Sequence, residues 1–293
     1  MSGAANPLRV ALLTHGGADR VLERLAALEG VRVVGVLVET ETTRPRPLRE
    51  TLRRSIKYDG YPATLAKLAR KLSGRGAGED DARGGAAARD GLREIARARG
   101  VPVHLVKNFH DPASIALLRE AAADLGVVYG TNIIKETVFG VPRLGSINLH
   151  QGLAPFYRGG PPVFWELFNG ERELGLTVHS VAAKVDAGEI ILQQTVPLAY
   201  DYAKHGARFE PFVEDLRERL REPSAALVAE AVRRIADGTA RPRPQDISLG
   251  ARYRLPTKRE KDELRRRLRA RYGRKLVAAE GDAATPAARG AED

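Results

Sequence analysis

The chain of 293 residues contains no cysteine, which excludes disulfide bonds and metal sites with thiolate ligands. It has no apolar run near the roughly 20 residues that a membrane-spanning helix requires. Its first residues do not combine a charged start with a long apolar stretch, so we expect no signal peptide. Its histidines lack the spacing of metal ligands. Together these absences predict a cytoplasmic protein with no membrane contact and no metal.

Positive charge is concentrated in one late part of the chain. The formal net charge is +11. Between Arg252 and Lys275, twelve Lys and Arg residues face three acids, a surplus of nine that leaves the remainder nearly neutral. Such a segment is typical of a solvated helix, and the alternative is an electrostatic contact with nucleic acid or with the phosphates of a small ligand.

Short apolar segments alternate with helical patterns over the first half of the chain. Leu8–Thr14 precedes a helical repeat and Val31–Glu39 follows it, as in a strand–helix–strand unit. Val101–Val106 and Gly126–Gly130 continue the alternation as buried strands. Because parallel strands need crossover helices, the pattern predicts an α/β fold with a Rossmann-like, mostly parallel sheet flanked by helices.

Two segments are expected to depart from this alternation. Residues 73–91 contain no aromatic and no branched aliphatic residue, which predicts a flexible surface insertion. Residues after 200 have helical patterns, one with Ser224 as its N-cap, and end in an expected disordered tail. We therefore divide the chain into a main domain of residues 1–200 and a helical, basic C-terminal extension of residues 201–293.

The most unusual segment is Asn148–Gly160, with the sequence NLHQGLAPFYRGG. Asn148 and His150 are alternate residues of an expected strand, so their side chains point to the same side. Ligands bind beyond the carboxyl ends of strands in open parallel sheets. Two donors there suit an oxyanion at a carbonyl carbon under attack, and Asp186, in an expected turn, is the candidate carboxylate to sustain a protonated imidazole. The alternative is a pair of structural residues at a strand end.

Residues 147–193 resemble the catalytic core of the folate-dependent formyltransferases, a family with methionyl-tRNA, glycinamide ribonucleotide and amino-sugar N-formyltransferases. The shared pattern is Asn-x-His at 148–150, Pro-x-Tyr-Arg-Gly at 155–159 and Asp-x-Gly at 186–188. The NGE sequence and the DAG turn are most similar to the amino-sugar enzymes. The resemblance extends over about residues 8–198 and is weakest before Val101, so residues 1–200 are expected to form the catalytic domain.

The resemblance implies an enzyme that transfers the formyl group of its co-substrate, 10-formyltetrahydrofolate, to a primary amine. Asn148 and protonated His150 would hold the oxyanion, while Asp186 would sustain the imidazolium and help to remove the amine proton. The folate ring would lie against these residues: Asn132, Ile133, Ile134, Gly160, Ala182, Ala183, Lys184 and Val185. His179, on the strand before Asp186, is a further candidate for the pocket.

The acceptor is expected to be an amine on a nucleotide-linked amino sugar or a similar small metabolite that can carry phosphate. Gln151, Gly152 and Ala154 depart from the commoner residues of the family loop, which leaves acceptor identity open. Methionyl-tRNA is disfavoured, because the residues after Phe209 show no alternating strands for the β-barrel of that enzyme. Two further alternatives are an inactive core with an RNA-binding basic segment, and a hydrolase that deformylates the folate.

Overall fold

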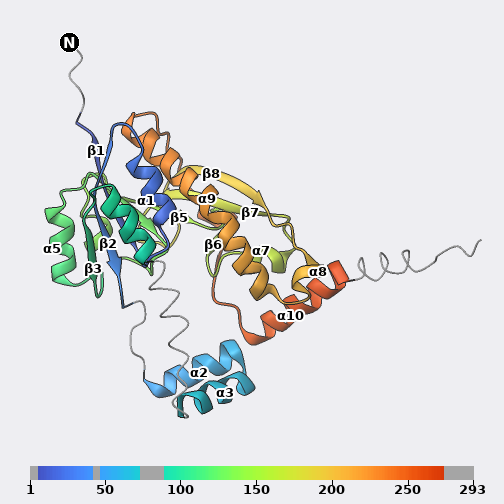
Figure 1. The fold of residues 1–293 in the computed structure, drawn as a ribbon. Helices are drawn as coiled ribbons and strands as arrows, with labels where there is room; N and C mark the ends of the chain where they lie inside the picture. Colours follow the sequence, from blue (N-terminus) through green and yellow to red (C-terminus); the bar gives the residue numbers. More distant parts are fainter. Residues whose placement is uncertain (1–5, 42–46, 73–88, 274–293) are drawn as a thin grey trace, which may run out of the picture.

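A computed structural model describes residues 6–41, 47–72 and 89–273. Its centre is a seven-stranded sheet in the order β3-β2-β1-β4-β5-β7-β8 (Figure 1). The strands are β1 Leu8–Thr14, β2 Val31–Glu39, β3 Val103–Val106, β4 Leu125–Tyr129, β5 Ser146–His150, β7 Glu173–Ser180 and β8 Ile190–Pro197. Strands β1 to β5 pair in parallel, whereas β7 and β8 join antiparallel. The predicted α/β fold with a mostly parallel sheet is confirmed.

Helices and short elements surround the sheet (Figure 1). The helices are α1 Asp19–Ala26, α2 Leu48–Asp59, α3 Tyr61–Leu72, α5 Pro112–Glu120, α6 Glu136–Phe139, α7 Phe164–Asn169, α8 Tyr202–His205, α9 Phe209–Ala236 and α10 Lys258–Leu268. Residues 89–98 are also helical. A 3₁₀ turn spans Ile247–Leu249 and a π turn spans Arg269–Gly273. Strand β6, Tyr157–Gly159, pairs in parallel with β9, Ala251–Tyr253, outside the main sheet.

The central strands of the sheet are buried on both faces, whereas the edge strand β3, predicted to be buried, leaves Leu105 47% exposed. In β1, Val10 and Leu12 point into one hydrophobic core, and Ala11 and Leu13 point into another. Helices α1 and α9 cover the first core, while α5 and α6 cover the second. Strands buried on both faces have continuous apolar sequences, which is why β1 and β2 could be predicted from the sequence.

Helix α9 contradicts the prediction that Ser224 begins a helix. One helix of 28 residues runs from Phe209 to Ala236 and includes Pro223. Ser224 is fully buried in its interior. Proline inside a helix removes a hydrogen bond and costs about 3 kcal/mol. Burial of α9 side chains such as Phe212 against the sheet outweighs that cost, because they belong to the same core as β1.

The predicted insertion at residues 73–91 is wrong at its end. Residues 89–91 belong to the helix at 89–98, because Leu92 and Ala96 of that helix are fully buried in the core. Residues 73–88, and the expected tail after residue 273, lie outside the described residues. Helices α2 and α3 were not predicted from the sequence. These two helices stand apart from the sheet (Figure 1), and Lys261 of α10 donates to the Tyr58 carbonyl of α2.

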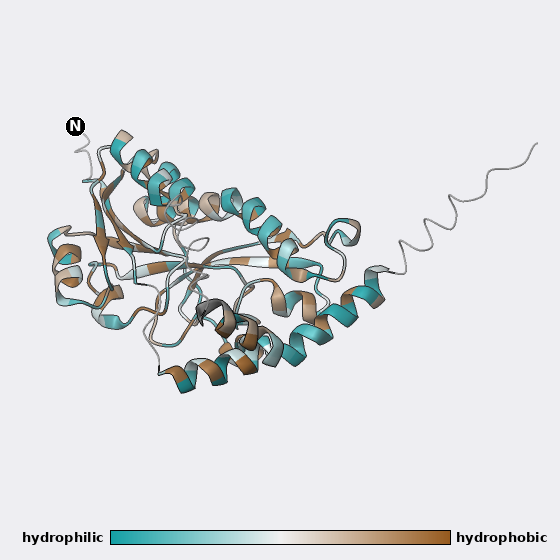
Figure 2. Ribbon diagram, turned by 60° about the horizontal axis from the view of Figure 1, so that its bottom comes forward, coloured by the Kyte–Doolittle hydropathy of each residue, from teal (hydrophilic) through white to brown (hydrophobic). Residues whose placement is uncertain are grey.

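The C-terminal helices differ in character. α9 packs on the sheet, whereas α10 is mostly hydrophilic (Figure 2) and begins with a capping box between Thr257 and Glu260. No helix within residues 6–41, 47–72 and 89–273 combines the length and apolar character needed to cross a lipid bilayer. The division of the chain at residue 200 remains a prediction.

Candidate active site

A cavity of about 620 Å³ lies beyond the carboxyl ends of β4 and β5, beside the turn between β7 and β8. It brings together most of the residues singled out in the sequence. Those that line it are Asn132, Ile133, Ile134, Asn148, His150, Gly160, Ala182, Ala183, Val185 and Asp186. Lys184 is not among the lining residues, and it is exposed to solvent. A folate contact of Lys184 therefore remains a prediction.

Strand β5 directs Asn148 and His150 into this cavity. The two residues alternate along the strand, so they share one face of the sheet. Asn148 lies opposite His179 in the antiparallel ladder with β7. The Asn148 amide nitrogen is 3.3 Å from Nε2 of His179, and Nδ1 of His179 is 2.8 Å from the Ser180 carbonyl. A carbonyl can only accept, so Nδ1 of His179 donates there and Nε2 is left to face Asn148 and the cavity.

The turn between β7 and β8 carries Asp186 to the two imidazoles. One carboxylate oxygen lies 3.4 Å from Nδ1 of His150, and the other lies 3.4 Å from Nε2 of His179. The oxygen that faces His150 also accepts a hydrogen bond of 2.9 Å from the Gly159 backbone N–H. Asp186 adopts a left-handed backbone with φ of 49°, which Asp and Asn tolerate better than most residues. The Asp-x-Gly turn thus fixes a carboxylate between two rings.

His150 has an acceptor at both ring nitrogens. Its Nε2 lies 2.7 Å from the Tyr157 carbonyl, so this nitrogen carries a proton, and Nδ1 faces Asp186. The pKa of His150 lies below its ordinary value because burial disfavours the charged ring, although the charge of Asp186 and the Tyr157 carbonyl act against that shift. Burial alone would raise the pKa of Asp186, but the hydrogen bond from His179, the charge of His150 and the Gly159 N–H lower it to about 2. The carboxylate is therefore ionised at neutral pH, and its charge favours a positive His150.

Gly152 makes room for the contact between His150 and the loop. A Cβ atom at residue 152 would collide with Nε2 of His150 and with the Tyr157 carbonyl oxygen. A larger residue at this position would push apart the hydrogen bond that orients the ring.

Gly188 is expected to be essential for the Asp186 turn. A Cβ atom at residue 188 would overlap the carbonyl oxygen of Ser180, a backbone group that cannot swing away. We expect Gly188→Ala to lower the free energy of unfolding by about 1–3 kcal/mol or more, measured by urea denaturation. Gly91→Ala is the control, because residue 91 is helical with open space around it, and it should be neutral or stabilise by about 0.5–1 kcal/mol. Equal stability of the two variants would contradict this explanation of the turn.

Several lining residues were missed in the sequence. One is Gln151, directly after β5. The others are Arg252, Tyr253 and Leu255, which follow Gly250. Tyr253 stacks on Tyr157, with ring centroids 5.2 Å apart. Only the pairing of β9 with β6 brings this segment to the site, and a three-residue strand leaves no recognisable pattern in the sequence. Trp165 and Phe168 pack with the core instead.

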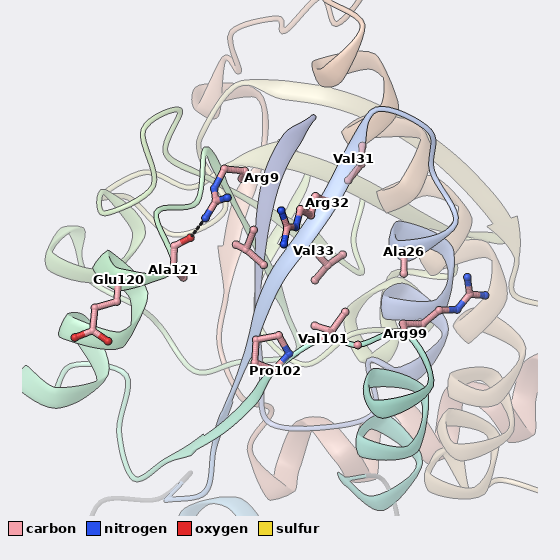
Figure 3. Close-up of a pocket in the computed structure, with 12 residues that line it drawn as sticks. Arg9, Ala26, Val31, Arg32, Val33, Arg99, Val101, Pro102, Glu120 and Ala121 are labelled. Carbon is pink, nitrogen blue, oxygen red and sulfur yellow. Dashed lines mark hydrogen bonds between the residues drawn. The ribbon is translucent and has the colours of Figure 1, made fainter. Parts of the chain in front are cut away.

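A second cavity, of about 500 Å³, lies at the opposite, amino ends of the parallel strands (Figure 3). Arg9, Arg32 and Arg99 are among the residues that line it. The Arg9 guanidinium donates to the Ala121 carbonyl at 2.8 Å. None of the residues predicted for the site lines this cavity. No group of three or more His, Asp or Glu side chains that could hold a metal ion occurs in the described part of the chain.

Comparison with known proteins places this site in a family. A family model described as formyl transferase matches residues 83–230, just over half of the chain. A methionyl-tRNA formyltransferase from Chlorobium chlorochromatii is 37% identical over 161 residues, which cover 55% of this chain and 48% of that protein. One from Roseiflexus sp. is 36% identical over 178 residues, covering 60% and 52%. The chain thus spans about half the length of these curated relatives.

Solved structures share the fold. Glycinamide ribonucleotide transformylase 1 from Symbiobacterium toebii matches with a TM-score of 0.54 and 22% identity, over 84% of this chain and 98% of that chain. Phosphoribosylglycinamide formyltransferase from Anaplasma phagocytophilum matches with a TM-score of 0.51 and 24% identity, over 79% and 88%. At these identities the likeness establishes the fold alone. With the match of the family model over residues 83–230, the chain belongs to the formyl transferase family.

Proposed function

We propose that the protein is an N-formyltransferase that moves the formyl group of 10-formyltetrahydrofolate to a primary amine. The acceptor in this proposal is a small, phosphate-bearing metabolite such as a nucleotide-linked amino sugar. One observation supports the reaction above all others: the Asp186 carboxylate lies 3.4 Å from His150 and 3.4 Å from His179 in a cavity that Asn148 also lines. Membership in the formyl transferase family supports the same reaction class.

The cavity suits a flat heterocycle such as the folate ring. Val128, Ile134 and Val181 provide apolar wall, and Ile133 is 67% exposed where a ring can cover it. Asn132 and Asn148 add a few polar groups. A mostly apolar cavity with a small number of placed polar groups is typical of a small-molecule site. When bound there, the folate would supply a formyl carbonyl that an amine can attack.

Two donors act on the oxygen of that carbonyl in this proposal. As the amine nitrogen bonds to the formyl carbon, the oxygen gains negative charge, which the Asn148 amide and the Nε2–H of His150 stabilise. In the structure this N–H donates to the Tyr157 carbonyl, and in the proposed reaction it turns from that carbonyl to the oxyanion. The bond from carbon to the folate nitrogen then breaks. The acceptor amine loses one proton and the folate nitrogen gains one, so the products are a formamide and tetrahydrofolate.

Asp186 is assigned an electrostatic role. A carboxyl whose pKa is about 2 is a weak base, so it is a poor final acceptor for the amine proton. Its negative charge beside Nδ1 instead favours the doubly protonated ring of His150, which is the stronger donor. His179 and the Gly159 N–H hold the carboxylate in position.

A methionyl-tRNA acceptor is the second candidate, because the relatives at 36% and 37% identity carry that name. Two observations favour a small acceptor. First, the described residues after 200 form helices and one strand of three residues, rather than the alternating strands expected for the β-barrel of the methionyl-tRNA enzyme. Second, several basic side chains after residue 250 already pair with acids, among them Arg254 with Glu260 at 2.8 Å and Arg266 with Glu263 at 2.6 Å. Such pairs leave less charge to contact nucleic-acid phosphates.

The proposal is tested by supplying 10-formyltetrahydrofolate with a panel of amines. The panel contains nucleotide-linked amino sugars, glycinamide ribonucleotide, small uncharged amines and methionyl-tRNA. Mass spectrometry detects the formylated acceptor, and absorbance follows tetrahydrofolate release. We expect formyl transfer to at least one phosphate-bearing small amine. Formate release without any acceptor would identify a hydrolase, formylation of methionyl-tRNA alone would assign tRNA as the acceptor, and salt-sensitive RNA retention without turnover would indicate a binding protein.

A further inference from the structure

Strand β9 reaches the cavity from a part of the chain after residue 230, where the match of the family model ends. Its residues pair in parallel with the end of the Pro-x-Tyr-Arg-Gly loop, with Arg252 opposite Arg158 and Tyr253 opposite Gly159. Two glycines admit the strand. A Cβ atom at residue 159 would lie 3.0 Å from the Tyr253 carbonyl oxygen, and one at Gly160 would lie 3.0 Å from Cβ of Tyr253. The close approach of β9 is thus built into the loop.

Several contacts hold β9 firmly. The Tyr253 ring lies between Tyr157, at 5.2 Å, and Trp165, at 5.0 Å. The Tyr253 hydroxyl accepts a hydrogen bond of 3.1 Å from Asn169. The indole N–H of Trp165 donates to the carbonyl of Arg254, directly after the strand, at 2.8 Å. At the other end of the strand, the Ala251 N–H donates to the Phe156 carbonyl at 3.2 Å. The backbone of Arg252, between these two anchored residues, is therefore held in place.

Arg252 is the middle residue of β9. Arg252 lines the catalytic cavity, its neighbour Ala251 lines a separate hollow, and the Tyr253 ring borders both. Among the described residues that line the catalytic cavity, Arg252 is the single Lys or Arg. It is exposed, so it lies at the rim.

The guanidinium of Arg252 has no partner within the described residues, in contrast to other basic side chains nearby. No ion pair or hydrogen bond of this side chain occurs with residues 6–41, 47–72 or 89–273. Arg254, two residues later, pairs with Glu260 at 2.8 Å. The one carboxylate of the cavity, Asp186, is already held by His150 and His179. A fork of uncommitted N–H donors is therefore available at the rim of this cavity.

We propose that Arg252 binds an oxyanion group of a substrate, a phosphate or a carboxylate, at the rim of the catalytic cavity. This proposal rests on the proposed formyltransferase function and deepens it. Two sources fit the chemistry: a phosphate of the amine acceptor, or a carboxylate of the glutamate tail of the folate. Arg252 is in this view a specificity residue that the helical extension contributes to the catalytic domain.

The test compares Arg252→Gln, which removes the charge, with Arg252→Lys, which keeps the charge but loses the planar fork. Arg259→Gln is the matched control, because Arg259 is exposed on α10 and does not line the cavity. Calorimetry measures binding of tetrahydrofolate and of tetrahydropteroate, which lacks the glutamate tail. Kinetics with 10-formyltetrahydrofolate give KM and kcat for a phosphate-bearing amine and for an uncharged amine.

We expect Arg252→Gln to weaken binding of either the phosphate-bearing amine or tetrahydrofolate by about ten-fold or more, a typical loss for a charge-assisted hydrogen bond. KM should change more than kcat. Arg252→Lys should lose less, and Arg259→Gln should match wild type. A selective rise in the KM of the phosphate-bearing amine assigns Arg252 to the acceptor. A loss of affinity for tetrahydrofolate without a matching loss for tetrahydropteroate assigns Arg252 to the folate tail. If Arg252→Gln matches Arg259→Gln throughout, the inference is wrong, whereas failure of the wild-type protein to bind tetrahydrofolate would instead count against the proposed function.

Discussion

Replacing His150 with alanine is expected to lower turnover by at least about 10²–10³-fold, and Asn148→Ala by about 10²–10³-fold, or roughly 2.7–4 kcal/mol each. Each change removes one donor for the oxyanion that forms during formyl transfer. His150→Ala should cost at least as much as Asn148→Ala, because it removes a charge as well as a donor. Both side chains leave the same face of β5 and line the same cavity, so the two losses should not be additive.

Folate affinity separates a catalytic loss from a binding loss. Donors used mainly when charge develops on the oxygen contribute little to ground-state binding. Tetrahydrofolate should therefore bind the Asn148→Ala variant with nearly wild-type affinity while turnover falls. His104→Ala is the control, since His104 lies on β3 and does not line the cavity. Circular dichroism and thermal melting establish that each variant is folded.

Near-wild-type turnover in folded variants of both residues would contradict the proposed reaction. Asn148 and His150 would then be structural residues at the end of β5, with the Asn148 amide packed beside His179 and the His150 ring donating to the Tyr157 carbonyl. A parallel loss of turnover and folate affinity would instead place both side chains in substrate binding.

The main sheet could be predicted from the sequence because its strands carry strong local signals. β1 and β2 are buried on both faces and have nearly continuous apolar sequences. The helices α2 and α3 gave no comparable signal. α2 has no buried residue, so its side chains show no face selected for the core. The continuity of α9 through Pro223 was missed for the opposite reason, because burial against the sheet overrode a strong local signal.

The site shows the same limit. Spacing along one strand was enough to place Asn148 and His150 on a common face, since strand geometry is local. Asp186 was a candidate from its turn, and the family resemblance strengthened it. His179 was left open because its contact with Asn148 depends on the register between β5 and β7. Arg252 depends on a three-residue pairing between distant segments, which no local pattern encodes.

Asp186→Asn is expected to shift the alkaline limb of the pH–turnover profile toward lower pH. Asparagine tolerates the left-handed backbone at this position and retains an oxygen to accept the Gly159 N–H, so the turn should persist. The negative charge is lost. Because Asp186 raises the pKa of His150 against the effect of burial, that pKa must fall in the variant.

The direction and size of this shift follow from the role of His150. If the ring acts as an imidazolium, activity declines as pH rises through its pKa, and a lower pKa moves that decline toward acid. A nearby opposite charge typically changes a pKa by about 1–3 units. Turnover on the alkaline side should thus fall about ten-fold or more, while the acid limb, set by deprotonation of the acceptor amine, stays in place. Asp215→Asn on α9 is the control, because Asp215 pairs with Lys204 and does not line the cavity. NMR titration of His150 measures its pKa without turnover, and an unchanged or raised value in Asp186→Asn would show that this carboxylate does not sustain the positive ring.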